Sequence, residues 1–254
     1  FGGIARLYGM AGLQRLHDAH VCVVGVGGVG SWVVEALARS GVGALTLIDL
    51  DDVCITNVNR QLPALEGTVG LPKVQVLAAR VALINPACRV QQVLEFVGES
   101  NAARLLDGGF DLVVDAVDRM SIKSVIIATC STLGVPVITV GSAGGRRDPT
   151  LVRCADLGYS ANDLLLQQVR RKLRGDYGFA KSDNGKAALM GIPCVYSNEK
   201  PVFAHSNGTC SLEPEAGTEA GLRLDCASGF GAATHVTGAF AFAAAAEAVR
   251  RLVG

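Results

Sequence analysis

The feature that most constrains the fold is a glycine-rich turn between an apolar run and a helical pattern, in VCVVGVGGVGSWVVEALARSGVGALTLIDLDDV (21–53). Gly25, Gly27 and Gly30 fit the spacing G-x-G-x-x-G between a strand and a helix. Such glycines permit a tight turn, the close approach of a phosphate, and close packing of the helix on the strand. With Gly28 and Ser31, the turn gathers backbone N–H groups at a helix start, where anions bind. The stretch predicts a nucleotide site, and it fits NAD, FAD and ATP equally.

Strand and helix patterns then alternate along the first 141 residues. Because the strands are almost continuously apolar, they indicate a parallel sheet that helices cover on both faces. We therefore predict an α/β, doubly wound, mainly parallel sheet of Rossmann-like type, in which ligands bind beyond the carboxyl ends of the strands. The expected strands are 21–25, 44–49, 89–94, 111–115 and 136–141, and the expected helices are about 30–40, 73–84, 100–107 and 121–133.

The pattern loosens after residue 142. A turn cluster (141–150) precedes a polar helix around 160–174, and the stretches 175–191 and 204–224 have the composition of mobile loops. With no repeat and no clear linker, the chain reads as one domain. We expect a single domain over 1–254, divided into a nucleotide-binding core (1–141) and a looser half (142–254) with substrate-side loops and a closing apolar helix.

The closing apolar stretch, VTGAFAFAAAAEAV (236–249), is too short and too interrupted to span a bilayer. We predict a buried or subunit-interface helix and no integral membrane span, with peripheral membrane association as the alternative. The formal net charge is zero, so no global field draws the protein to nucleic acid or anionic lipid. Any polyanion site must therefore be a local patch.

The eight cysteines contain no Cys-x-x-Cys pair, although structural zinc sites usually draw on such pairs. Cys22 lies in an apolar strand and Cys130 in an apolar helix pattern, where free cysteine acts as a small hydrophobe. No signal peptide is visible, although the chain opens at Phe1 without a methionine. These features predict reduced thiols in a cytoplasmic protein.

Charged residues beside the expected crevice narrow the choice of nucleotide. Asp49 ends the second strand, where a carboxylate can accept a hydrogen bond from a ribose hydroxyl. Arg60 in TNVNRQ (56–61) and Lys73 in GLPKV (70–74) flank the same crevice. NAD needs no such cations, whereas attack on the α-phosphate of a nucleotide develops negative charge that cations stabilise. The alternative is that Arg60 caps a loop and Lys73 merely opens a solvated helix.

Two carboxylates follow the fourth strand in VVDAVDRM. Asp115 and Asp118 lie at the carboxyl edge of the sheet, where Mg²⁺ bound to phosphates needs hard oxygen ligands. Asp118 is the better candidate because it lies past the end of the strand. The alternative for Asp115 is an ordinary carboxylate at a strand end.

The motifs GVGGVG, DLDDV, NVNRQ, GLPK and DAVD, in this order and spacing, resemble those of the E1-like (ThiF-type) adenylating enzymes over residues 1–141. The resemblance implies that the chain binds ATP and Mg²⁺ and converts a carboxylate into an acyl adenylate, releasing pyrophosphate. It also implies a homodimer in which Arg6 of one subunit reaches the partner's site. The implied catalytic residues are Arg60, Lys73 and Asp118. The implied nucleotide contacts are Gly25, Gly27, Gly28, Gly30, Asp51 and Gln61, together with Asp49 on the ribose. The implied ligands of the triphosphate are Asn57, Arg60 and Lys73. Asp118 is implied both to contact the nucleotide and to anchor magnesium.

Further segments separate branches of that family. The activators of sulfur-carrier proteins usually carry two Cys-x-x-Cys pairs, which are absent here. Instead FGGIARLYG, GSAGGRRDPT, RRKLRGDYG, CVYSNEKP and CASGFGAATHVTG resemble the tRNA threonylcarbamoyladenosine dehydratases. That resemblance implies ATP-dependent activation of the threonyl carboxylate on the modified adenosine at position 37 of tRNA. The ureido group of the same nucleoside then closes a ring and expels AMP.

Two alternatives stay open. One is adenylation of the C-terminus of a ubiquitin-like sulfur-carrier protein. The other is a non-catalytic nucleotide-binding scaffold that docks a cysteine desulfurase or another sulfur-transfer partner. A monovalent cation near the glycine-rich closing segment is a further candidate ligand.

The tRNA substrate that the resemblance implies would require cations that neutralise its phosphates. The candidates are Arg146, Arg147 and the run Arg170, Arg171, Lys172 and Arg174, whose alternative is a solvated helix face. Cys194 and Cys226 are candidate functional thiols, with packing as the alternative. His205 is a candidate base or a solvated loop residue, and His235 is expected to be a hydrogen-bonded core residue.

Overall fold

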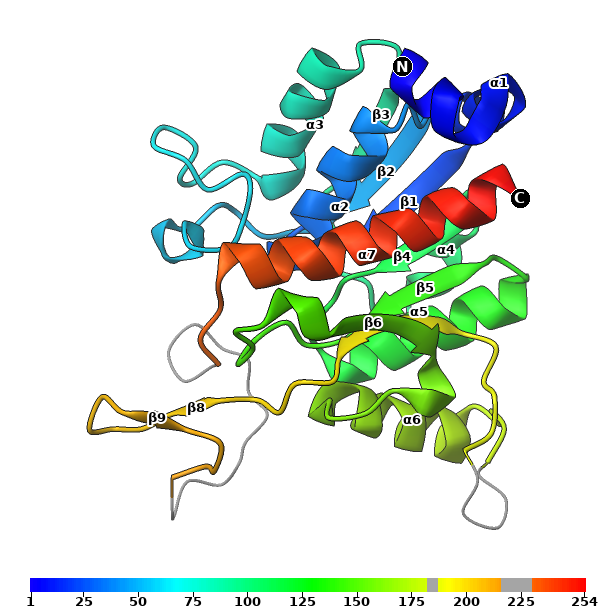
Figure 1. Ribbon diagram of the computed structural model, residues 1–254. Coiled ribbons are helices and arrows are strands. Elements are labelled where there is room, and N and C mark those ends of the chain that lie inside the picture. The colour runs from blue at the N-terminus through cyan, green and yellow to red at the C-terminus, as the bar shows by residue number, and fades with distance from the viewer. Residues whose placement is uncertain (182–186, 216–229) are drawn as a thin grey trace.

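The computed structural model describes residues 1–181, 187–215 and 230–254. A seven-stranded sheet lies between two layers of helices (Figure 1). The helices are α1 Gly2–Asp18, α2 Gly28–Arg39, α3 Lys73–Ile84, α4 Ala102–Leu106, α5 Met120–Leu133, α6 Leu164–Asp176 and α7 Thr234–Val253. The strands of the sheet are β1 His20–Val24, β2 Ala44–Ile48, β3 Arg89–Val93, β4 Leu112–Asp115, β5 Val137–Val140, β6 Val152–Asp156 and β7 Pro193–Ser197.

The strand order in this sheet is β3-β2-β1-β4-β5-β7-β6. All neighbouring strands are parallel except β6, which runs antiparallel to β7. Val24 pairs with Ile48 on one side and Asp115 on the other, so β1, β2 and β4 end level with one another. The doubly wound, mainly parallel fold is confirmed, and the five expected strands match β1 to β5 to within one residue at each end.

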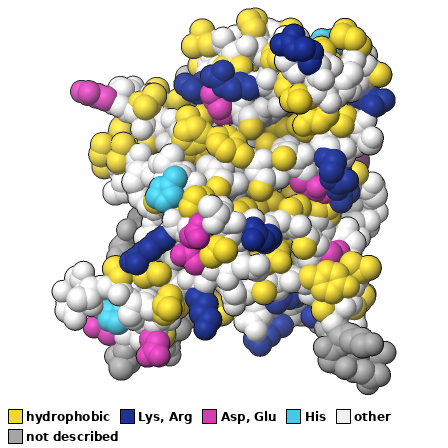
Figure 2. Space-filling view, viewed as in Figure 1, with side chains coloured by type: hydrophobic (Ala, Val, Ile, Leu, Met, Phe, Trp, Pro, Cys, Tyr) yellow, Lys and Arg dark blue, Asp and Glu magenta, His cyan; other side chains and the backbone are white. Residues whose placement is uncertain are grey.

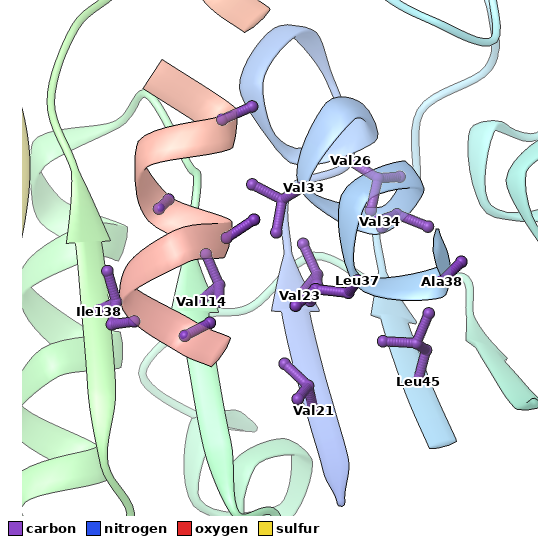
Figure 3. Close-up of a cluster of buried hydrophobic side chains, with 14 of the residues drawn as sticks. Val21, Val23, Val26, Val33, Val34, Leu37, Ala38, Leu45, Val114 and Ile138 are labelled. Carbon is purple, nitrogen blue, oxygen red and sulfur yellow. The ribbon is translucent and has the colours of Figure 1, made fainter. Parts of the chain in front are cut away.

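Two apolar cores hold the layers together. One lies between the sheet and the layer of α1, α2, α3 and α7, and the other lies between the sheet and α4, α5 and α6. Figure 3 shows the first, where Val33 and Leu37 of α2 point toward Val21 and Val23 of β1. These side chains are fully buried, and burying each contributes roughly 1.5–3 kcal/mol relative to exposure. The cores fix the strands rigidly, so the loops at their carboxyl ends are held in place.

The closing apolar stretch forms α7, which lies along α2 and across the sheet (Figure 1). Its inner face is small and apolar, with Ala241, Ala244 and Ala248 fully buried, which allows close approach of the two helices. Phe242 on the outer face is 51% exposed. The expected buried helix is therefore confirmed for one of its faces. Among the described residues, no helix combines the length and the apolarity that a membrane crossing requires.

Several elements were not expected from the sequence. Helix α1 buries only Gly12 and Leu16 and is interrupted at Gly9. Because so few of its residues are buried, its sequence carries little of the apolar periodicity that predicts a helix. The strands β6 and β7 and a small hairpin, β8 Phe203–Ala204 with β9 Cys210–Ser211, complete the looser half. The polar helix expected around 160–174 is α6. Of the expected mobile loops, residues 182–186 and 216–224 lie outside the described part of the chain.

Candidate nucleotide site at the carboxyl edge of the sheet

The glycine turn joins β1 to α2 through backbone that other residues do not fit. Gly25 has φ +79°, and a Cβ there would lie 3.1 Å from the carbonyl oxygen of Ala116 and 3.2 Å from the nitrogen of Val117. A Cβ on Gly30 would lie 1.8 Å from the carbonyl oxygen of Gly25. The missing side chains therefore let α2 start directly against the end of β1, with the β4–α5 turn packed beside it.

The start of α2 places backbone N–H groups at the carboxyl edge of the sheet. Gly27 is the N-cap residue, and its carbonyl oxygen accepts the bond from the Ser31 nitrogen at 3.1 Å. The N–H groups of the first turn have no acceptor within the helix, which makes this end favourable for an anion. The Ser31 hydroxyl accepts a hydrogen bond from the Leu62 nitrogen at 3.2 Å, which ties the NRQ loop to the helix start.

Two side chains of the NRQ loop border this turn. A Cβ on Gly28 would lie 3.8 Å from the aliphatic part of the Arg60 side chain. A Cβ on Gly27 would lie 3.6 Å from the amide nitrogen of Gln61. The Gln61 Oε1 atom is buried without a hydrogen-bond partner among the described residues. Because an unpaired buried amide oxygen is costly, a donor from a bound ligand would relieve this position.

The guanidinium of Arg60 is only partly engaged. Its Nη1 donates to the Thr56 carbonyl at 2.9 Å and to Asn59 Oδ1 at 3.0 Å. A guanidinium has five N–H donors in all, so donors remain for a phosphate. The Asn57 side chain is buried, and its Oδ1 accepts from the Cys54 nitrogen at 3.1 Å. Asn57 thus shapes the loop that carries Arg60.

The ammonium of Lys73 lies inside the protein. Lys73 opens α3 as expected, but it is only 5% exposed, and its Nζ lies 2.8 Å from Asp51 Oδ2. The alternative of a solvated helix start is therefore wrong. Asp49 is half-buried and accepts hydrogen bonds from the backbone nitrogens of Val26 (2.8 Å) and Asp51 (2.9 Å). Burial raises the pKa of Asp49, although those two hydrogen bonds and the charge of Lys73 oppose it.

The two carboxylates after β4 have different surroundings. Asp118 is exposed in the turn between β4 and α5 and makes no ion pair within the described residues. Asp115 is fully buried, and its Oδ2 accepts from Lys123 Nζ and from Thr139 Oγ1, each at 2.7 Å. Asp115 is thus an internal ion-pair partner and faces no solvent. Lys123 was missed, and the signal for it is a lysine within the apolar helix pattern MSIKSVII.

The described carboxylate, histidine and thiol side chains form no group of three that would hold a metal alone. A magnesium ion at Asp118 would therefore complete its shell with nucleotide oxygens and water, which is the usual mode for this ion.

The ThiF family profile matches residues 3–254, which is nearly the whole chain. The chain belongs to the ThiF family. It is 48% identical to the tRNA threonylcarbamoyladenosine dehydratase of Escherichia coli over 254 residues, covering 100% of this chain and 93% of that protein. The crystal structure of the E. coli enzyme in complex with ATP superposes with a TM-score of 0.85 at 44% identity, covering 99% of this chain and 93% of that one. The molybdopterin-synthase adenylyltransferase of Salmonella typhimurium is 38% identical over 136 residues, 54% of each chain.

In this ThiF-family chain, Arg6 lies far from the glycine turn of its own subunit. Arg6 is exposed on α1. The Leu16 carbonyl at the end of α1 accepts from the Gly43 nitrogen at 3.0 Å, just before β2 begins. Helix α1 therefore packs at the amino edge of the sheet, opposite the nucleotide edge. An Arg6 contact with a nucleotide would have to come from a second subunit, as the resemblance implies.

The expected phosphate-binding cations separate into buried and exposed groups. Arg146 is 4% exposed, and its guanidinium donates to the backbone carbonyls of Glu199 and Asn162, so its assignment as a surface contact for tRNA is wrong. Burial lowers the pKa of Arg146, against the charges of Asp163 and Glu199. Arg147 next to it is exposed.

In α6, only Arg171 of the four cations is exposed, and the other three are partly buried. Arg170 donates to the Ser160 hydroxyl, Lys172 pairs with Asp176 at 2.7 Å, and Arg174 donates to the Ala180 carbonyl at 3.0 Å. On the face shown in Figure 2 the cationic side chains are scattered and form no single patch. The exposed candidates for a phosphate contact are therefore Arg147 and Arg171.

The structure shows the surroundings of three of the four thiol and histidine candidates. Cys194 is fully buried, and burial raises its pKa well above the ordinary value, so packing accounts for it. Cys226 lies outside the described residues. His205 Nε2 lies 3.0 Å from the Glu213 carbonyl and 3.1 Å from the Ser211 hydroxyl. The expected core position of His235 is wrong, because this residue is exposed near the start of α7. Its expected hydrogen bond is present, with Nε2 3.3 Å from the Arg147 carbonyl oxygen.

Proposed function

We propose that this chain catalyses the ATP-dependent dehydration (cyclisation) of threonylcarbamoyladenosine at position 37 of tRNA, through an acyl-adenylate intermediate. The observation that carries the proposal is the meeting of the glycine turn, Arg60, Gln61 and Lys73 at one edge of the sheet. It is supported by the full-length similarity to a protein of that name.

The chemistry takes two balanced steps. An oxygen of the threonyl carboxylate attacks the α-phosphorus of ATP, and pyrophosphate leaves. The ureido group of the same nucleoside then attacks the activated carbonyl carbon, loses a proton and expels AMP, so the nucleoside loses one water overall. An internal nucleophile has a large effective molarity, so no enzyme thioester is needed. This agrees with the burial of Cys194.

Each site residue has its own role in binding the nucleotide or stabilising charge. The first turn of α2 and Asn57 bind phosphate oxygens, and Asp49 accepts a hydrogen bond from a ribose hydroxyl. Asp51 holds Lys73 through the 2.8 Å ion pair between them. Arg60 and Lys73 stabilise negative charge that develops on the α-phosphate, an effect that preorganised donors commonly make worth about 10²–10³ in rate. Asp118 supplies a hard oxygen ligand for Mg²⁺, which neutralises phosphate charge when bound.

We also make proposals about domain organisation, tRNA contacts and subunit assembly. We propose one functional unit over 1–254, in which 1–141 binds the nucleotide and 142–254 faces the tRNA, with Arg147 and Arg171 as phosphate contacts. We also propose a cytoplasmic homodimer in which Arg6 serves the partner's site. A desulfurase partner, peripheral membrane association and a monovalent cation stay predictions. Of the glycine-rich closing segment DCASGFGAATHVTG (225–238), residues 225–229 lie outside the described part of the chain.

The decisive experiment supplies the protein with ATP, Mg²⁺ and tRNA that carries threonylcarbamoyladenosine. Mass spectrometry of the digested tRNA should show the modified nucleoside lighter by one water, with AMP and pyrophosphate released in equal amounts. Pyrophosphate exchange that depends on a carrier protein ending in Gly-Gly, and not on tRNA, would favour the sulfur-carrier alternative. ATP binding without AMP release for either acceptor would favour the scaffold.

Variants of the two cations test their roles. Arg60→Ala and Lys73→Met should each lower kcat by about 10²–10³ while the melting temperature falls by only a few degrees. Lys73→Met keeps the buried stem and removes the charge. Arg250→Ala is the matched control. Arg250 is an exposed cation that pairs with Glu247 at 2.7 Å near the C-terminal end of α7, whereas the N-terminal end of that helix contacts Asn59 of the NRQ loop. Retention of full turnover by both site variants would contradict the proposed roles.

A further inference from the structure

One of the largest fully buried side chains described in the protein is a lysine, Lys123 of α5. Its Nζ makes three contacts: 2.7 Å to Asp115 Oδ2, 3.3 Å to the Asp115 carbonyl oxygen, and 3.2 Å to Thr139 Oγ1. These three acceptors match the three N–H groups of an ammonium. Lys123 therefore joins α5 to the ends of β4 and β5 with all of its donors satisfied.

Asp115 carries this connection to the turn that follows β4. Its Oδ2 receives Lys123 and Thr139, and its Oδ1 accepts from the Val117 nitrogen at 3.2 Å. Both carboxylate oxygens are thus occupied, and one of them fixes the Ala116–Val117 peptide, one peptide before Asp118. The orientation of this turn depends on where Lys123 holds the carboxylate.

The same peptide packs on the glycine turn. The Ala116 carbonyl and the Val117 nitrogen lie 3.1 and 3.2 Å from where a Cβ on Gly25 would lie. A continuous series of contacts therefore runs from Lys123 through Asp115 and Val117 to Gly25. At its end, the turn that bears Asp118 lies beside the turn that presents backbone N–H groups to phosphates.

General stability does not account for this arrangement. A fully buried ion pair is frequently no more stable than a well-packed apolar pair of similar volume, because both charges lose their hydration. What such a pair does supply is a fixed geometry. The Lys123–Asp115 pair is joined by a hydrogen bond to the 116–118 turn, which carries the proposed magnesium ligand Asp118.

We propose that Lys123 is a positioning residue for the magnesium–nucleotide complex. Through Asp115 it holds the 116–118 turn against Gly25 and so sets the place of the Asp118 carboxylate relative to the phosphates. The proposal rests on the proposed function. It predicts that loss of Lys123 weakens the contribution of magnesium to nucleotide binding more than it weakens nucleotide binding itself.

Binding is measured through the single tryptophan, Trp32, whose Nε1 donates to the Arg60 carbonyl at 3.2 Å. ATP is titrated into the full chain, once with excess Mg²⁺ and once with EDTA. In Lys123→Met, the magnesium concentration that gives half of the effect should rise about 10-fold, the size seen when residues that orient metal ligands are lost. The affinity for ATP in EDTA should change by less than about twofold. Combining Lys123→Met with Asp118→Asn should add little to Asp118→Asn alone, since the two act through one group.

Two further variants separate positioning from folding. Glu35→Gln is the matched control. It breaks the ion pair between Glu35 of α2 and Arg80 of α3, whose charged atoms lie 2.6 Å apart, and it should leave the magnesium effect unchanged. The double variant Asp115→Asn/Lys123→Met removes the unpaired buried charge if the single variant folds poorly. It should fold and still show the weakened magnesium effect.

A result that contradicts the positioning role differs from one that contradicts the proposed function. If either folded variant keeps the magnesium effect of the wild type, the positioning role is overturned while the proposed function stands. If the wild-type chain itself binds no ATP, the proposed function is overturned.

Discussion

Gly30 offers the sharpest test of how the glycine turn is built. A Cβ at this position would lie 1.8 Å from the Gly25 carbonyl oxygen, and contacts below 3.0 Å are essentially never seen, so α2 must move by at least 1.2 Å (3.0 − 1.8). The obstacle is backbone and cannot rotate away. Overpacking of this kind typically costs about 1–3 kcal/mol, and we expect Gly30→Ala to fall at the upper end, about 3 kcal/mol.

That cost has two measurable consequences. For a chain of this size each kcal/mol corresponds to roughly 2–4 °C, so the melting temperature of Gly30→Ala should fall by roughly 6–12 °C in thermal unfolding followed by circular dichroism. Displacement of the helix start by about 1 Å should also lower turnover by up to about 10²-fold, because reacting groups lose alignment.

Gly28→Ala is the matched control in the same turn. Its Cβ would meet only ordinary contacts, 3.6 Å to Thr237 Cγ2 and 3.8 Å to Arg60 Cγ. Its melting temperature should stay within about 2 °C of the wild type, because alanine is also favoured over glycine in helices. If Gly30→Ala melts as the wild type does, or if both variants lose the same stability, the close approach of α2 to β1 is not what the glycine is needed for.

Two further predictions concern titration and reactivity. Burial alone would raise the pKa of Glu35, but hydrogen bonds from Arg80 and Arg39 lower it overall. Its stabilising contribution is therefore present above the ordinary pKa of 4.5 and lost as the pH falls through the lower folded value. Urea unfolding should show Glu35→Gln less stable by about 1 kcal/mol at pH 7, with the difference closing as the pH falls below 4.5; a constant difference would contradict this. Cys54 is exposed, and a hydrogen bond from the Thr56 hydroxyl lowers its pKa, whereas burial raises the pKa of Cys130 to about 12. Iodoacetamide followed by peptide mass spectrometry should label Cys54 well before Cys130, and the reverse order would refute the assigned environments.

Local sequence patterns were sufficient for much of the core. The expected helix 73–84 coincides with α3, and the five expected strands match β1 to β5, because buried strands and amphipathic helices repeat over a few residues. The same holds for the glycine turn, whose spacing reflects contacts between residues only five apart, Gly25 and Gly30. Parallel topology then brought Asp49, Lys73 and Asp118 to one edge, since parallel strands end on the same side.

The partners of polar side chains could not be predicted in this way. Arg146 was expected on the surface but is buried on the carbonyl of Glu199, a residue 53 positions further along the chain. His235 was expected in the core but faces out at the start of α7. In each case the outcome depends on a partner that folding brings near, and no local period encodes that partner.

The sequence by itself determined the succession of β1 to β5 and the helices between them, the glycine turn, and the edge of the sheet where charged residues gather. Only the tertiary structure decided which charges are satisfied inside the protein and which are available to a ligand. Lys123 and Asp115 became an internal pair, whereas Asp118, three residues further on, stays exposed. The physical reason is that a charge leaves water only when compensating groups surround it, and those groups come from segments far apart in the chain.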